Sequence, residues 1–84
     1  IEVPAVVGKA GPTPLVVGEI PLGIAGLLKH VDAYENLAVK AGAEGCKATA
    51  LLALCSHPFV KSTDVGKRLL DELITANQPY IKLS

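Results

Sequence analysis

The sequence predicts an α+β domain that is mainly helical, with an N-terminal two-stranded hairpin followed by three helices. Three observations support this prediction. Valine-rich runs flank a glycine-bounded loop near the N-terminus, apolar residues recur at helical spacing further along, and proline or glycine stands where helices should end. We expect the hairpin over about residues 1–18 and the helices over about residues 21–41, 44–56 and 63–76.

The hairpin is predicted from the segment IEVPAVVGKAGPTPLVVG, in which two β-branched runs enclose a loop at residues 8–11. A loop of that length connects antiparallel strands. Pro4, Pro12 and Pro14 cannot donate a backbone hydrogen bond, so we expect edge strands or poorly paired strands. A lone hairpin is at best marginally stable in water, and this one is expected to pack on something else.

The longest amphipathic stretch of the chain runs from Ile20 to Gly42. Its apolar stripe follows the i, i+3, i+4, i+7 pattern and comprises Ile24, Leu27, Leu28, Val31, Tyr34 and Ala38. Pro21 suits the first helical turn, and Gly42 suits the left-handed residue after the last turn. Glu35 lies near the middle of the stripe, where an unpaired buried charge is too costly to keep. We therefore predict a buried Glu35 carboxylate held by a backbone N–H, by Arg68 or by a lysine.

The second helix is predicted from the run AEGCKATALLALCS, which is apolar on all sides of the helix axis. A helix of this kind is normally enclosed on every side, and two neighbouring helices can hardly enclose it. His57 precedes Pro58 and is pushed out of helical geometry, so the helix should end there.

The third helix should open with a Ser62 or Thr63 cap and carry Asp64 in its first turn, where a carboxylate favours the positive end of the helix. Its apolar face comprises Val65, Leu69, Leu70, Leu73, Ile74 and Ala76. Asn77 and Pro79 should end the helix, and residues 79–81 are expected to form a short extended tail.

The composition indicates that the chain has apolar surface that another protein surface would have to cover. Half of the 84 residues are hydrophobic and only 4% are aromatic, which gives a soft aliphatic core with apolar surface to spare. The formal charge is zero, so we expect no nucleic-acid partner and no attraction to anionic membranes. No apolar run reaches the roughly 20 residues that span a bilayer. The strand-like start without methionine leads us to expect a fragment or a processed chain.

Two cysteines and two histidines are the candidates for nucleophilic or metal chemistry. Cys55 lies beside His57, as a nucleophile and base could, and Cys46 and His30 are the other soft ligands. Cys55 lies on an apolar helix, where free cysteine behaves as a small hydrophobe, so packing is the favoured interpretation. We expect the cysteines on opposite helix faces, unable to form a disulfide or share a metal, in a reduced intracellular protein.

The remaining motifs are also interpreted structurally. The small-residue pair in Gly23 to Gly26 favours close helix packing over RNA binding, because basic residues do not cluster around it. The loop at residues 8–11 is a turn rather than a phosphate loop, since it lacks the Gly-Lys-Ser/Thr step. Asp32, Asp71 and Glu72 are expected to be solvated surface charges. We therefore predict no catalytic, cofactor-binding or metal-binding residue in the chain.

Five landmarks follow one another along nearly the whole chain. They are I-E-V-P-A at residues 1–5, G-x-x-P-L-x-V-G at 11–18, V-x-A-Y-E-x-L-A-V-x-A at 31–41, the alanine- and leucine-rich run that ends in His-Pro at 57–58, and L-L-D-E-L at 69–73 ahead of Asn-x-x-Tyr. Their order resembles the carboxyl-terminal end of the family 4 glycoside hydrolases. Gly26-Leu27 and the spacing from Val31 to Tyr34 resemble the 6-phospho-β-glucosidase branch of that family.

The resemblance implies a parent enzyme of the α/β, lactate dehydrogenase-like kind that depends on NAD and a divalent metal, with manganese expected. In that family the cofactor takes a hydride from carbon 3 of the phosphorylated sugar, the acidified proton at carbon 2 is removed, the aglycone leaves, water adds and the hydride returns. By resemblance, the dinucleotide loop, the metal ligands and the base precede the E-V-P-A landmark. The segment would then be an inactive part of the substrate-binding domain of a cytoplasmic homo-oligomer, with the rest of the enzyme as its partner.

Two other classes of function stay open at this point. A free-standing helical module could use its excess apolar surface to bind a partner protein. A small Cys/His redox or metal protein is the third possibility, which stoichiometric zinc or iron in the purified chain would support. For the isolated chain we expect self-association through the exposed faces of the second and third helices.

Overall fold

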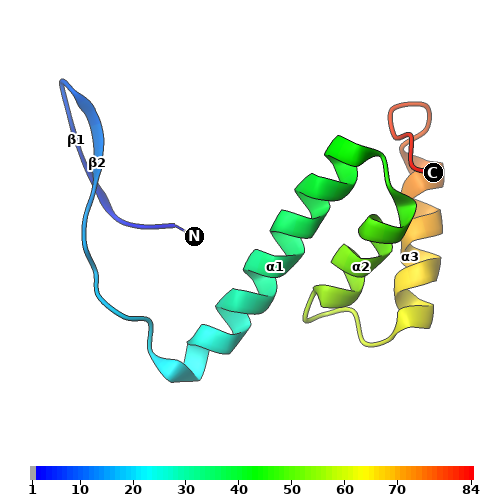
Figure 1. Cartoon of the computed structure of the whole chain (residues 1–84), viewed down its shortest axis with the longest axis horizontal. Helices are drawn as coiled ribbons and strands as arrows, with labels where there is room; N and C mark the ends of the chain where they lie inside the picture. Colours follow the sequence, from blue (N-terminus) through cyan, green and yellow to red (C-terminus); the bar gives the residue numbers. More distant parts are fainter. Residues whose placement is uncertain (1) are drawn as a thin grey trace.

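The computed structural model describes residues 2–84 and places a hairpin arm at one end of a long helix and a group of helices at the other (Figure 1). Strands β1 (Ala5–Gly8) and β2 (Gly11–Pro14) form an antiparallel pair, with Val6 opposite Thr13 and Gly8 opposite Gly11. Gly11 closes the turn with φ +100°, a backbone conformation that residues other than glycine rarely adopt. The predicted order, a hairpin followed by three helices, is confirmed.

Helix α1 (Leu22–Glu44) continues past its predicted end. Gly42 lies inside the helix, and the left-handed residue is Gly45, with φ +64°. The backbone N–H groups of Gly45 and Cys46 both donate to the Ala41 carbonyl, which is the usual way to complete a last turn. The prediction that Gly42 ends the helix was therefore wrong. A single interior glycine costs a helix only about 1 kcal/mol, which tertiary contacts can offset.

The ends of the other two helices agree largely with the capping and proline signals in the sequence. Helix α2 (Lys47–Ser56) begins after the turn at Gly45, later than predicted, and stops at His57, which has the extended conformation expected before a proline. Helix α3 spans Thr63–Ala76, as predicted. The Ser62 hydroxyl oxygen accepts a hydrogen bond of 3.2 Å from the Val65 N–H, which identifies Ser62 as the cap.

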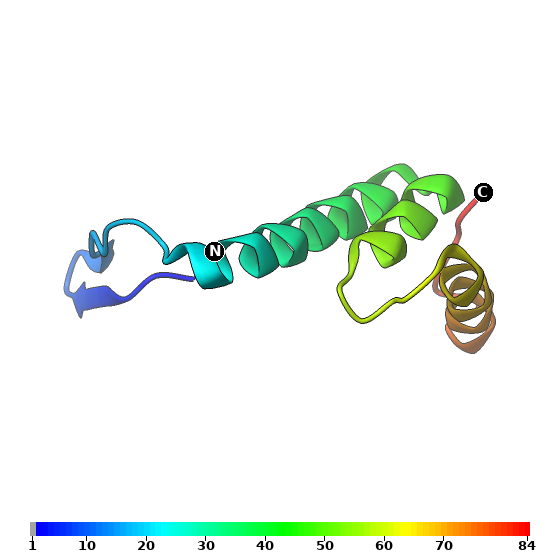
Figure 2. The same cartoon turned by 90° about the horizontal axis from the view of Figure 1, so that it is seen from below.

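Helix α2 lies between the second half of α1 and helix α3 (Figures 1 and 2). After α3 the chain turns at residues 77–80 rather than extending, and then runs back to the junction of α1 and α2. There the Ser84 N–H donates to the Gly45 carbonyl and the Lys47 N–H donates to the Ser84 carbonyl, both over 2.9 Å. The tail thus ties the end of the chain to the turn at Gly45.

Few apolar side chains are buried in this arrangement. Among residues 2–84 the buried hydrophobic residues are Ala41, Ala53 and Leu70. Val16 and Leu22, by contrast, are 99% and 94% exposed, and strands β1 and β2 contact none of the helices. The prediction that the chain has more apolar surface than it can cover is confirmed. No helix in this part of the chain is long and apolar enough to cross a membrane.

Glu35 does not behave as the sequence predicts. Its side chain is exposed, and within residues 2–84 it makes no ion pair or hydrogen bond. The reason is that α2 is much shorter than α1 and covers only the second half of α1, on the side that contains the buried Ala41. The stripe that begins at Ile24 and Leu27 has no partner, and the predicted buried carboxylate was wrong for this chain.

Candidate functional site

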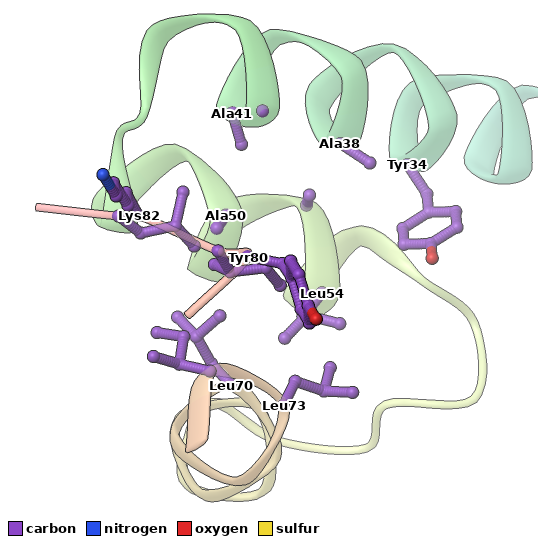
Figure 3. Close-up of a pocket in the computed structure, with 14 residues that line it drawn as sticks. Tyr34, Ala38, Ala41, Ala50, Leu54, Leu70, Leu73, Tyr80 and Lys82 are labelled. Atoms are coloured by element: carbon purple, nitrogen blue, oxygen red, sulfur yellow. The ribbon is translucent and has the colours of Figure 1, made fainter. Parts of the chain in front are cut away.

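An apolar cleft of about 320 Å³ lies between the three helices and the returning tail (Figure 3). Leu70 and Leu73 of α3 face Leu54 of α2 across the cleft, and Ala38 and Ala41 of α1 form another wall. The lining residues whose side chains carry a polar group are Tyr34, Tyr80 and Lys82. The residues that line it include no carboxylate, imidazole or thiol, so the cleft offers mainly apolar contact, and the lining side chains that can transfer a proton are those of Tyr34, Tyr80 and Lys82.

The Cys55-Ser56-His57 sequence does not assemble a nucleophile with its base. The Ser56 hydroxyl donates to the Leu52 carbonyl over 2.8 Å, as a helical serine commonly does. The His57 ring accepts a hydrogen bond at Nδ1 from the Phe59 N–H over 3.1 Å. It also lies edge-on to Tyr34, with ring centroids 4.7 Å apart. The histidine therefore anchors the loop between α2 and α3 against α1.

Cys55 packs at the contact between α2 and α3. A Cβ atom added to Gly66 would lie 3.0 Å from the Cys55 sulfur and 3.5 Å from a Leu51 methyl carbon. Gly66 is itself buried, so the two helices approach through a glycine and a cysteine. The structure thus gives Cys55 a packing role.

We expect Gly66→Ala to lower the free energy of unfolding by about 1 kcal/mol. The overpacking cost of about 1–3 kcal/mol exceeds the gain of up to about 1 kcal/mol in helix propensity. Adding Cys55→Ala should recover most of the loss, because it removes the sulfur that the new methyl group meets. Chemical denaturation of the three variants measures this, and a Gly66→Ala chain that is more stable than the parent would contradict the packing argument.

Cys46 precedes α2 and is free, as is Cys55, in agreement with the prediction that they form no disulfide. The Thr49 hydroxyl and backbone N–H, which are donors near the sulfur, lower the pKa of the Cys46 thiol because they favour the thiolate. Across residues 2–84, no three His, Cys, Asp or Glu side chains gather closely enough to hold a metal ion. His30 is exposed on α1 and takes part in no such group.

The lowered pKa of Cys46 gives a pH-dependent prediction. In the parent chain its alkylation by iodoacetamide should rise at lower pH than in the Thr49→Val variant, which keeps the shape but loses the hydroxyl donor. Mass spectrometry of the Cys46 peptide after timed labelling across a pH series measures both profiles. Superimposable profiles would show that the hydroxyl does not stabilise the thiolate.

The acidic residues lie at the surface and form no acid–base pair. Asp32 accepts hydrogen bonds from the Asn36 side chain at both its carbonyl and its carboxylate. Asp71 pairs with Lys47 over 3.0 Å, with side chains 67% and 50% exposed, so this ion pair contributes at most about 1 kcal/mol. Glu72 is exposed. The predicted surface role of these carboxylates is confirmed.

Of the two predictions made for glycine motifs, one is confirmed and one was wrong. The loop at residues 8–11 is a turn between the strands, as expected. Gly23 and Gly26 were expected to allow close helix packing, but a Cβ at either position would meet nothing within 4 Å. In the part of the chain that the structure describes, no helix packs against that end of α1.

The comparison with known proteins identifies the family. Residues 1–60 match the family described as "Family 4 glycosyl hydrolase C-terminal domain". The chain belongs to this family. The resemblance found in the order of the sequence landmarks is thereby confirmed.

Three similar proteins are much longer than this chain. A probable 6-phospho-beta-glucosidase of Bacillus subtilis is 38% identical over 96% of this chain and 18% of its own length. A phospho-alpha-glucosidase of Clostridium acetobutylicum is 49% identical over 95% of the chain and 18% of its length. The crystal structure of a 6-phospho-alpha-glucosidase from gut microorganisms, in complex with NAD and glucose-6-phosphate, matches with a TM-score of 0.94 and 38% identity. That match covers 99% of this chain and 19% of the solved one, so the chain spans about a fifth of the length of its relatives.

No complete site for NAD or a divalent metal is formed by residues 2–84 alone. A dinucleotide loop needs closely spaced glycines between a strand and a helix, and no such sequence occurs here. A metal needs several ligands around one point, and the described His, Cys, Asp and Glu residues do not converge. That the segment contributes no residue to either group stays a prediction.

The returning tail is the feature that the sequence reasoning missed. Ile81 and Leu83 are half-buried and help to line the cleft, whereas Lys82 between them is exposed. This alternation of apolar and polar residues is the signal that could have indicated a docked, extended segment rather than a free end.

Proposed function

We propose that the family 4 segment is the carboxyl-terminal part of an NAD-dependent enzyme that hydrolyses 6-phosphoglucosides. The observation that carries the proposal is the match of 99% of the segment, with a TM-score of 0.94, to a 6-phospho-alpha-glucosidase in complex with NAD and glucose-6-phosphate. The full-length relatives with similar sequences carry phosphoglucosidase names, which supports the same substrate class.

Within this enzyme we assign the segment a structural role in the substrate-binding domain. The residues that line the apolar cleft include no carboxylate, imidazole or thiol, and within residues 2–84 the cysteines and histidines form no group that could hold a metal ion. NAD, a divalent metal such as manganese and the catalytic base would then be held by the part of the enzyme outside this segment. The uncovered faces of α1 and α2 would pack against that part, which fits Leu27 and Leu52 being more than half exposed here, at 54% and 56%.

The anomer of the substrate is the point on which the relatives differ. The pattern around Gly26-Leu27 favours a 6-phospho-β-glucoside, whereas the 49% identical relative and the solved structure carry names for α-linked substrates. Since the proposal gives this segment no group at the glycosidic bond, the choice of anomer would belong to the rest of the enzyme. The β-glucoside stays our prediction.

The test is an assay of the full-length enzyme with the p-nitrophenyl 6-phosphoglucosides of both anomers, with and without NAD and manganese. We expect hydrolysis of one phosphorylated anomer that needs both additions, no hydrolysis of the unphosphorylated glucosides, and no activity of the isolated segment. Equal activity without NAD, or activity on unphosphorylated glucosides alone, would overturn the proposal. Turnover by the isolated segment would overturn its structural role.

We further propose that the enzyme is a cytoplasmic homo-oligomer and that the isolated segment self-associates through α2 and α3. The exposed apolar side chains, including Leu52 of α2 and Leu73 of α3, support the second statement. Sedimentation velocity of the segment should show the weight-average mass rising with concentration. A single monomer mass across a hundredfold range would contradict self-association.

A further inference from the structure

The two strands of the hairpin have different outer edges. The Leu15 N–H donates to the Pro4 carbonyl over 2.9 Å, so these residues form a hydrogen-bonded pair. Hydrogen-bonded and non-hydrogen-bonded pairs alternate along an antiparallel ladder. With the observed register, the pairs that do not exchange hydrogen bonds are therefore Ala5 with Pro14 and Val7 with Pro12. The backbone groups of those residues face away from the partner strand.

This alternation makes one edge closed and the other open. On β2 both outward positions are prolines, so Pro12 and Pro14 leave the ladder of the hairpin intact but offer no N–H to a further strand. On β1 both outward positions, Ala5 and Val7, keep an N–H and a carbonyl. An additional strand can therefore pair with β1 and not, by a regular ladder, with β2.

We infer that the outer edge of β1 pairs with a strand from the part of the enzyme that precedes residue 1, and that β2 is the last strand of the resulting sheet. This inference rests on the proposed function insofar as it takes the segment to be the carboxyl-terminal part of a longer enzyme. It goes further by naming the edge, the backbone groups and the kind of partner.

The placement of the hairpin arm indicates that the strand that pairs with β1 comes from the same enzyme. The strands themselves contact no helix of this chain, and near the arm it is Glu2, ahead of β1, that lies beside Leu28 and Val31 of α1. The same arrangement nevertheless matches 99% of the chain to a solved enzyme about five times as long. The position of the arm is therefore one that the larger protein adopts.

The exposure of the arm argues against a second copy as the occupant. Val6 and Val7 point to opposite faces of the hairpin and are 59% and 78% exposed. Edge-to-edge pairing of two copies through β1 would use the free N–H groups but leave both apolar faces in water. The interior of a larger domain covers the faces and the edge together.

Hydrogen exchange at single-amide resolution tests the inference in the full-length enzyme, with the isolated segment as reference. The amides of Ala5 and Val7 should exchange about 100-fold more slowly in the enzyme than in the segment, because an external carbonyl accepts each of them. Equal exchange in the two would overturn the inference. Protection that disappears when the enzyme is diluted to monomers would also overturn it, because the occupant would then be a second copy.

A matched pair of variants separates the backbone from the side chain. Val7→Pro in the full-length enzyme removes the outward N–H but no bond of the hairpin itself, whereas Val7→Ala keeps the N–H and removes apolar volume. We expect the melting temperature to fall about 2–4 °C further in Val7→Pro than in Val7→Ala. Equal melting temperatures would overturn the inference. Should Val7→Pro fail to fold, the exchange of the parent enzyme still decides the question.

The hydrogen-exchange result and the activity assay test the inference and the proposed function separately. Protected Ala5 and Val7 amides in a protein without phosphoglucosidase activity would support the inference and reject the function. An active enzyme with unprotected amides at these positions would reject the inference alone.

Discussion

Replacing Leu70 by alanine should lower the free energy of unfolding of the 84-residue chain by about 2–4 kcal/mol. Leu70 is 5% exposed and is the one large side chain among the three buried hydrophobic residues of the described chain. It lines the cleft on one side and contributes to a second hollow beside Lys47 and Leu51 on the other. Few other contacts could compensate for a cavity at this position.

The control for this prediction is Leu52→Ala on the neighbouring helix. Leu52 is 56% exposed, so its truncation in the isolated chain should cost less than about 1 kcal/mol. Circular dichroism at 222 nm during thermal and urea denaturation measures both variants. Similar losses for the two leucines would show that Leu70 does not hold α3 in place.

Gly45→Ala is expected to lower the free energy of unfolding by about 1–2 kcal/mol, whereas Gly42→Ala should raise it by about 0.5–1 kcal/mol. Gly45 has φ +64°, and a Cβ there would lie 3.2 Å from the Lys82 carbonyl oxygen. The alanine would be strained and would push the tail away from the Ser84 to Gly45 hydrogen bond. Gly42 is helical with open space around it, so a methyl group there improves helix propensity without a clash.

The two glycine variants should therefore change stability in opposite directions. Urea denaturation of the chain, followed by far-ultraviolet circular dichroism, gives both values under one condition. A destabilising Gly42→Ala together with a neutral Gly45→Ala would reverse the assignment of the helix end.

The helix ends show where local sequence signals suffice and where they do not. Ser62 and the His57-Pro58 step act within one turn of the chain, and both helix boundaries next to them were predicted correctly. Gly42 and Gly45 are equally good candidates for a left-handed residue. In the structure Gly45 is the left-handed residue, and the tail from the far end of the sequence forms a hydrogen bond with it. Contacts of that range are not visible in local patterns.

The error at Glu35 has a different origin. The periodicity of α1 correctly predicted one amphipathic helix, and the error was to assume that its whole apolar stripe is covered by this chain. Helix α2 reaches only the half of α1 that includes Ala41, so the stripe around Leu27 stays uncovered and Glu35 lies in the open. Periodicity indicates which face is apolar, but it does not say whether the partner is in the same segment.

In the candidate site, too, local features could be predicted from the sequence and contacts between distant segments could not. The packing role of Cys55 was anticipated from its apolar helix, whereas the contact of His57 with Tyr34 depends on a neighbouring helix and was not predicted. The apolar cleft depends on the tail, for which the alternation of apolar and polar residues from Ile81 to Leu83 is the only local signal. The absence of site residues from the segment stays a prediction, because the proposed reaction centre lies in sequence outside it.

The two prolines of β2 also limit aggregation. Fibril growth proceeds by adding strands to an exposed edge whose amides are free to donate. A sheet that ends in Pro12 and Pro14 has no such template along that strand, so neighbouring molecules cannot extend it by a regular ladder. During synthesis and folding, an aliphatic arm as exposed as this one is therefore vulnerable along β1 alone.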